Sequence, residues 1–270
     1  MTLVRLALTR RWLGILAMTV AFAVACIALG QWQFARRAEA QAAIELLNAN
    51  YDEVPRPVTS VLDFIDNADR TLKWVPVELT GRYLTDRVVY VRTRISAAGI
   101  GFEQLVPFLD DSGNVLVIDR GWVAADSSNA NPVEPPAIPK VPVTVVARLM
   151  PTEQTIAGRD APEGQIATIH VPTIAGRLNN PTYVAWYARV ETETPATATG
   201  IPWDRPTLDE GPHLSYALQW YVFAVMGFIG YGWALRKEAR GPLEPLEPKN
   251  RKGRQLDEDF EDAAVDARTP

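Results

Sequence analysis

Two long blocks without a charged residue, one near each end of the chain, constrain the fold more than any other feature. The first runs from Trp12 to Trp32 and the second from Leu214 to Leu235. A helix needs about 20 consecutive apolar residues to cross a bilayer, and each block supplies them. Tryptophans at both ends of the first block are typical of a membrane–water interface. The sequence therefore predicts two transmembrane helices, over residues 12–32 and 213–235.

Three other interpretations fit the first block less well. A cleaved signal peptide would have a shorter apolar core, followed directly by a small-residue cleavage site. A lipoprotein would be cleaved before Cys26, but the apolar run continues past this cysteine to Leu29. A buried helix of a soluble protein does not account for two blocks of this length. An uncleaved anchor is the favoured interpretation.

Small residues recur along the first block at helical spacing. Such stripes allow membrane helices to approach closely, so they predict the face that packs against the second span. Cys26 is expected to be a packing residue at the same depth. The stripe consists of Gly14, Ala17, Ala21, Ala25 and Ala28.

Basic residues flank both blocks on the side that leads away from the central segment. They are Arg5, Arg10 and Arg11 before the first block, and Arg236, Lys237 and Arg240 after the second. Residues 33–212 carry 16 basic and 23 acidic side chains. Short basic flanks stay in the cytoplasm, whereas long loops cross regardless of charge. We expect a multi-pass protein of the cell (plasma) membrane, with residues 1–11 and 236–270 in the cytoplasm and 33–212 outside.

Short stretches that alternate apolar and polar residues fill the central segment. Turn residues such as those at 110–114 separate them. Many short strands with turn signals predict a mainly β domain, an antiparallel sandwich or a barrel, with its core in about residues 74–190. The expected strands are residues 74–84, 87–94, 102–109, 115–123, 141–150, 166–170 and 183–190.

Other parts of the chain read as helix or as irregular structure. Residues 33–49 are rich in Ala, Glu, Gln and Arg, so the first span is expected to continue as a helix until Pro55 and Pro57. A short helix is expected at residues 172–178, with proline near its start. The tail after Gly241 has prolines and mixed charge runs, which predict disorder.

Composition and motifs exclude several classes of protein. A net charge of −5 argues against a nucleic-acid partner held by phosphate neutralisation. One cysteine excludes an internal disulfide and a cysteine-based zinc site. The chain has no phosphate-binding glycine motif, no HExxH and no GxSxG. We therefore expect no catalytic residues and no enzymatic activity.

His213 is the most informative polar residue, because it begins the second block and is one of only two histidines. A neutral imidazole can ligate a metal or haem iron. Its spacing from Tyr216, Ala217 and Trp220 places all four on one helical face. The alternative is that the histidine and aromatic residues anchor the helix at the membrane interface. The second histidine, His170, lies in an expected strand and is interpreted as structural.

The triplet Arg120, Gly121 and Trp122 ends another expected strand. Glycine between a charged residue and tryptophan indicates a bulge or a close backbone approach. The favoured interpretation is a local packing device within the sheet.

Together, several segments of this chain resemble the SURF1 (surfeit locus protein 1) family. Their order, spacing and two-span frame carry the resemblance, over about residues 10–237. Where the family often has a lysine after Arg36, this chain reads Arg37, Ala38 and Glu39. The matching segments are Leu29–Gln33 with Arg36 (LGxWQxxR), Pro76–Tyr83 (PVxxxGxY), residues 101–107 and 111–123 (ending in RGWV), and His213–Tyr221 (HLxYAxxWY).

The resemblance implies an assembly chaperone for a haem-copper oxidase, an aa3-type cytochrome c oxidase (respiratory chain complex IV). Such a protein would assist insertion of haem a into subunit I and bind haem a transiently. His213 would be the candidate iron ligand, with Tyr216 and Trp220 packing on the haem face in an aromatic-rich interface between the spans. The other motif positions, for which a structural role is expected, are Trp32, Arg36, Arg120, Gly121 and Trp122.

The expected partners are subunit I, its assembly intermediates and the lipid bilayer. Homo-oligomer formation is left open. An alternative is a membrane-tethered scaffold that stabilises oxidase intermediates without binding haem. A further alternative, an envelope sensor or enzyme, requires a ligand pocket or catalytic constellation within residues 74–190.

Overall fold

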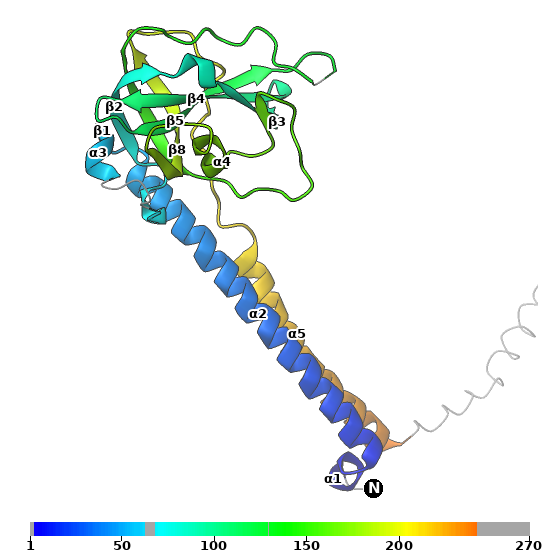
Figure 1. The fold of residues 1–270 in the computed structure, drawn as a ribbon. Helices are drawn as coiled ribbons and strands as arrows, with labels where there is room; N and C mark the ends of the chain where they lie inside the picture. The colour runs from blue at the N-terminus through cyan, green and yellow to red at the C-terminus, as the bar shows by residue number, and fades with distance from the viewer. Residues whose placement is uncertain (1–2, 63–67, 129, 242–270) are drawn as a thin grey trace, which may run out of the picture. The chain divides into compact units, whose positions relative to one another are not determined.

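The computed structural model describes residues 3–62, 68–128 and 130–241. Its described residues form two compact units (Figure 1). The helical unit joins residues up to Arg36 to those from Pro212 onward, and the barrel unit is Arg37–Gly211. The tail for which disorder was expected lies outside the described residues.

Two long helices form the helical unit, with the short α1 (Leu3–Ala7) before them. Helix α2 runs over Arg10–Asn50 and α5 over His213–Arg240. The two lie side by side and antiparallel (Figure 1), because residues at opposite ends of α2 meet opposite ends of α5. Arg11 of α2 is paired with Glu238 at 3.3 Å, and Gln31 donates to the Tyr221 hydroxyl at 2.9 Å. As predicted, α2 continues as a helix beyond the first apolar block.

Both helices are long and apolar enough to cross a membrane. Most of their large apolar side chains are exposed, among them Met18, Phe22, Val225 and Trp233. A core helix of a soluble protein would bury these side chains against other elements. The exposure is therefore consistent with a membrane protein.

The predicted packing stripe of the first block is wrong. Gly14, Ala17, Ala21, Ala25 and Ala28 are all exposed. The buried positions of α2 lie on another face, where Ala23 and Cys26 pack against Ala224 of α5. Gly30 lies on that face too, because a Cβ there would be 2.8 Å from the Tyr221 ring. Small residues occur on several faces of this helix, so complementarity to α5 selects the contact. Cys26 is a packing residue, as expected.

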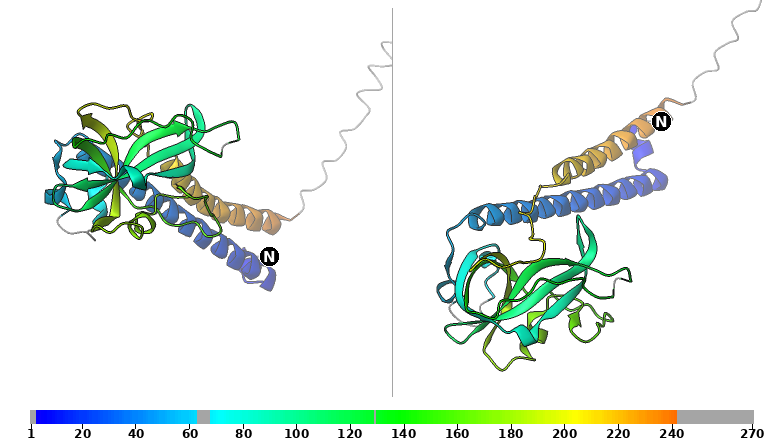
Figure 2. Two further views of the ribbon diagram at one scale, coloured as in Figure 1. Left: turned by 45° about the horizontal axis from the view of Figure 1, so that its top comes forward. Right: turned by 90° about the horizontal axis from the view of Figure 1, so that it is seen from above.

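Eight strands form the sheet of the barrel unit, in the order β1-β2-β6-β8-β5-β4-β3-β7. An additional pairing of β2 with β4 closes a ring of β2, β6, β8, β5 and β4, and the strands curve round on themselves (Figure 2). The strands are β1 (Arg56–Pro57), β2 (Pro76–Tyr83), β3 (Val89–Ser96), β4 (Gly99–Asp110), β5 (Val115–Ala124), β6 (Val143–Pro151), β7 (Gln165–Ile166) and β8 (Thr182–Thr194).

Of the two β architectures that the sequence left open, the structure is therefore barrel-like rather than a sandwich. Its strands are not all antiparallel, because β5 and β8 pair in parallel. A closed ring of five strands cannot alternate direction all the way round, so at least one neighbouring pair must be parallel. Closure removes the exposed sheet edges that a sandwich would leave.

Alternate residues of the ring strands point into the barrel or outward. Leu116 and Ile118 of β5 belong to the inner cluster, which draws residues from all five ring strands. Val117 belongs to an outer cluster, covered by Leu47 near the end of α2 and by the short helix α4 (Val171–Ala175). Both faces of β5 are thus buried, which explains its nearly continuous apolar run.

Two strand predictions need correction. Residues 166–170 are not a strand, since β7 ends at Ile166 and His170 is the N-cap residue of α4. Strand β8 extends beyond the predicted end at Val190, to Thr194. This extension brings Glu193 into the barrel unit's core. The remaining short helices are α3 (Val58–Val61), η1 (Arg70–Leu72) and η2 (Thr85–Arg87).

Candidate functional site

His213 lies at the first position of α5 and is partly exposed. Its Nδ1 is 2.8 Å from Oε1 of Gln33 on α2. An amide oxygen only accepts hydrogen bonds, so Nδ1 carries the proton and donates it. In the neutral imidazole, the Nε2 atom then keeps its lone pair. This tautomer and the fixed ring orientation are what an axial iron ligand requires, so His213 fits haem iron.

The other residues of the helical unit that were predicted to share a face with His213 do not all point in one direction. Trp220 is partly buried, contacts the Ala23, Cys26 and Ala224 cluster, and meets Phe223 edge to face at 5.8 Å. Tyr216 is 48% exposed, whereas its neighbour Ala217 is fully buried. The expected face therefore divides: Ala217 and Trp220 turn toward the helix contact, and Tyr216 turns outward.

Trp32 of α2 is 55% exposed, and Arg36 of the same helix is also exposed. Gln33 is the residue that sequence reasoning missed, although it stands inside the LGxWQxxR segment. Among the described residues, no group of three or more His, Cys, Asp or Glu side chains could hold a metal ion. An axial haem ligand needs only one such side chain, and His213 is the candidate.

The predicted triplet lies in the barrel unit. Arg120 is fully buried and continues the inward-facing series of Leu116 and Ile118 on β5. Its Nε and Nη2 donate to the two carboxylate oxygens of Glu193, at 2.8 and 3.0 Å. Nη1 donates to Gln104 Oε1 at 3.1 Å, and Nη2 also to the Ala198 carbonyl at 2.9 Å. This bidentate, fully bonded arrangement is what makes a buried arginine tolerable.

Glu193 is buried, and its carboxylate accepts hydrogen bonds from three side chains, of which Arg120 is one. Tyr83 donates its hydroxyl at 2.6 Å, and Thr197 also donates to the carboxylate. Burial opposes ionisation, but the hydrogen bonds from Arg120, Thr197 and Tyr83 hold the pKa of Glu193 below its usual value. Glu193 therefore stays charged opposite Arg120.

Gly121 and Trp122 tie the same strand to the segment that follows β8. Gly121 has φ of +102°, and a Cβ there would lie 2.7 Å from the Ile201 carbonyl oxygen. The Trp122 amide donates to that carbonyl at 2.9 Å, and the Ile201 amide donates back at 2.8 Å. The predicted close backbone approach is present, and only glycine fits it.

Asp119 and Glu103 form an outward-facing acid pair that sequence reasoning did not single out. Burial, together with the Asp119 charge, raises the pKa of Glu103 to about 8, although Arg94 and Arg189 oppose this. Burial also raises the pKa of Asp119. Trp203 donates its indole N–H to Asp119 at 3.0 Å. Only the folded sheet brings these residues together, since they come from separate strands and a loop.

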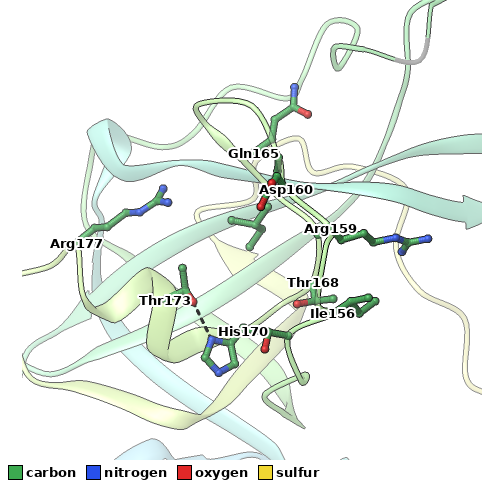
Figure 3. Close-up of a pocket in the computed structure, with 12 residues that line it drawn as sticks. Ile156, Arg159, Asp160, Gln165, Thr168, His170, Thr173 and Arg177 are labelled. Carbon is green, nitrogen blue, oxygen red and sulfur yellow. Dashed lines mark hydrogen bonds between the residues drawn. The ribbon is translucent and has the colours of Figure 1, made fainter.

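His170 lines a pocket of about 250 Å³ beside α4 (Figure 3). Its Nδ1 is 2.8 Å from the Thr173 hydroxyl. Arg177 and Asp160 lie on other walls of the same pocket. This histidine belongs to the barrel unit and His213 to the helical unit, so each has a separate environment.

The chain matches the SURF1 family model over residues 20–225. Uncharacterized SURF1-like proteins of Mycobacterium bovis and Mycobacterium tuberculosis are each 31% identical to it over 252 residues, which cover 88% of this chain and 90% of each relative. A SURF1-like protein of Rickettsia bellii is 25% identical over 131 residues, which cover 48% of this chain and 50% of that protein. With its barrel unit, most of α2 and the first part of α5 inside the matched region, the chain belongs to the SURF1 family.

Proposed function

We propose that this protein is a membrane-bound, non-enzymatic assembly factor that assists the insertion of haem a into subunit I of an aa3-type cytochrome c oxidase. Family membership supports the assembly role. The observation that carries the haem step is the His213–Gln33 hydrogen bond, which leaves Nε2 with a free lone pair. Haem a, when bound, would supply the iron that this nitrogen ligates.

The chain's own residues supply orientation and shelter. Gln33 fixes the His213 ring and its tautomer, so that no proton has to leave Nε2 before ligation. Ala217, Ala23 and Cys26 fill the contact between α2 and α5 with small side chains. With this contact filled, the residues that would hold a macrocycle are His213 and the exposed Tyr216, rather than side chains between the helices as the aromatic pattern suggested.

The proposed topology follows from the charge flanks. The apolar block of α2 is preceded by Arg5, Arg10 and Arg11. Lys237 and Arg240 lie in the last turn of α5. These basic flanks favour the cytoplasmic side of the cell membrane, with residues 33–212 outside. His213 then lies near the outer surface, and subunit I and its intermediates are the partners.

The test uses the full chain, co-expressed with haem a synthesis and purified in detergent. His213→Ala is expected to lose most of the co-purified haem and its axial-ligand signature in the absorption spectrum. Gln33→Leu should weaken binding about tenfold or more, because second-shell partners of a ligating histidine typically matter that much. His170→Ala is the matched control, and it should retain haem.

Unchanged haem content and ligation in His213→Ala would sink the haem step. If the wild-type protein carries no haem while gene deletion still abolishes the haem a band of membranes, the scaffold alternative replaces it. A normal haem a band and normal oxidase activity after deletion would count against both roles.

A further inference from the structure

A second pocket of the barrel unit, about 160 Å³ in volume, combines aromatic walls with two arginines. The walls are Tyr51, Trp74 and Trp203, and the guanidinium groups belong to Arg148 and Arg189. The carboxylates of Glu191 and Asp204 also line the pocket, and all of these residues lie in Arg37–Gly211. None of them belongs to the hydrogen-bond network of Arg120 or is a proposed haem ligand.

Arg148 and Arg189 are direct cross-strand partners on the antiparallel strands β6 and β8. Partners in register point to the same face, and like charges there destabilise the pair. Arg148 is paired with Glu191 at 3.0 Å. The atoms of Arg189 stay 3.6 Å from Asp119 and 3.7 Å from Glu103, longer than a hydrogen bond. Arg148 also donates to the Tyr51 carbonyl, so its charge is compensated, whereas Arg189 has no short ion pair among the described residues.

Arg189 is the less compensated of the two. Its Nε is buried and has no hydrogen-bond partner among the described residues. Glu103, one of its two acidic neighbours, already lies 2.5 Å from Nε of Arg94. Arg189 therefore has donor capacity that an added carboxylate would satisfy.

The aromatic walls are held in fixed positions. The Arg148 guanidinium lies 3.9 Å from the centre of the Tyr51 ring, and that of Arg189 lies 4.6 Å from the Trp203 ring. Trp74 is buried with φ of +76°, a strained conformation for a bulky residue. Its amide donates to the Leu149 carbonyl at 2.8 Å, which helps to hold it there. Strained residues of this kind concentrate at binding sites.

We propose that this pocket binds the carboxylate-bearing edge of a flat, apolar ligand, with Arg148 and Arg189 receiving the carboxylate and the Tyr51, Trp74 and Trp203 rings contacting the flat body. A planar guanidinium matches a carboxylate in a bidentate manner. A volume of about 160 Å³ admits the edge of such a ligand rather than the whole of it. A porphyrin with carboxylate side chains has this chemistry; that ligand identity rests on the proposed function, whereas the site rests on its own geometry.

The experiment titrates the full chain in detergent with metal-free protoporphyrin IX, a dicarboxylate, and follows quenching of tryptophan fluorescence. Without iron, the probe has nothing for His213 to ligate. Arg148→Gln and Arg189→Gln are each expected to weaken binding about tenfold or more, as loss of a charge-assisted contact does. The dimethyl ester of the probe should bind at least tenfold more weakly than the diacid.

Arg205→Gln is the matched control. Arg205 also stacks on Tyr51, at 4.7 Å, and it is paired with Asp52, but it does not line the pocket. Arg205→Gln removes a positive charge beside the Tyr51 ring without changing the pocket lining, so binding of the probe should stay within twofold of wild type. Arg148→Lys keeps the charge without the planar fork and should give an intermediate affinity. Circular dichroism of each variant establishes that it is folded.

Wild-type affinity in folded Arg148→Gln and Arg189→Gln, or equal affinity for diacid and ester, would overturn the proposal. So would a loss of metal-free porphyrin binding in His213→Ala, because that result would place the probe on the helical unit. If the pocket variants retain haem while His213→Ala loses it, that result would support the proposed function and refute the pocket proposal.

Discussion

The barrel unit and the helical unit bury opposite kinds of side chain. The barrel unit buries Arg120 and Glu193 inside the barrel and Asp119 on its outer face, and each of them has several hydrogen-bond partners. The helical unit buries mainly small side chains such as Ala23 and Cys26, and exposes large apolar ones. The barrel follows the rules of a protein folded in water, where buried charge must be paired. The helix pair is consistent with the rules for a protein in lipid, where close packing replaces the hydrophobic effect.

The largest expected effect comes from removing one partner of the ion pair that is buried in the barrel. Arg120→Ala leaves Glu193 charged and buried with only Tyr83 and Thr197 as donors, so the free energy of unfolding should fall by about 3–5 kcal/mol. Denaturant unfolding of the barrel, followed by tryptophan fluorescence, measures this. Arg82→Ala is the control, since Arg82 is an exposed residue of β2, and its effect should stay within about 0.5 kcal/mol. Similar losses of unfolding free energy in the two variants would show that the buried network stabilises the barrel no more than an exposed arginine does.

A smaller effect, the pH dependence of stability, distinguishes Glu103 from Glu193. The folded state raises the pKa of Glu103 from 4.5 to about 8, so the folded state binds the extra proton. Its contribution is complete below pH 4.5 and is lost as the pH rises toward 8. The free energy of unfolding should therefore fall across that window, and Asp119, whose pKa is also raised, adds to the fall. Glu193 acts in the opposite direction, since its lowered pKa makes acid the destabilising condition.

Glu103→Gln should flatten the decline of stability between pH 4.5 and 8. Unfolding curves of the wild type and variant at closely spaced pH values provide the measurement. Glu191→Gln, at an exposed position of the same sheet, is the control and should leave the slope unchanged. A wild-type slope in Glu103→Gln would assign the pH dependence to another group.

The smallest expected effect tests the packing face of the helical unit. Gly30→Ala places a Cβ 2.8 Å from the Tyr221 ring, a side chain that can shift, so the cost should be about 1 kcal/mol. Ala28→Leu adds a larger group at an exposed position and should cost almost nothing. Unfolding in mixed detergent micelles with increasing dodecyl sulfate compares the two. If Ala28→Leu proves the more disruptive variant, the contact face described for α2 is wrong.

Much of the architecture could be predicted from local patterns. The apolar blocks predicted two long helices because their length and lack of charge are properties of consecutive residues. Alternation predicted most of the strands in the same way. The close backbone approach at Gly121 was expected from its neighbours, although Gly200 and Ile201, the partners that require it, could not be named. His213 stood out because histidine is rare in this chain.

Other features depend on residues that are far apart in the sequence. The ring of five strands with its parallel pair follows from the contact of β2 with β4, which no local pattern encodes. Glu193 lies beyond residue 190, where the last strand was expected to end, so the sequence did not identify it as the partner of Arg120. The pairing of Arg148 with Arg189 depends on strand register, which only the folded sheet sets.

The sequence by itself determined two apolar helices, a β-rich segment between them and a resemblance that the family match bears out. Those features arise from neighbours in the chain, where periodicity and charge are visible. Only the tertiary structure decided which face of α2 packs, because small residues occupy more than one face and α5 fits only one of them. It also joined Gln33 to His213 and Glu193 to Arg120. These hydrogen bonds link residues 73 or more positions apart, and folding alone brings their atoms within reach.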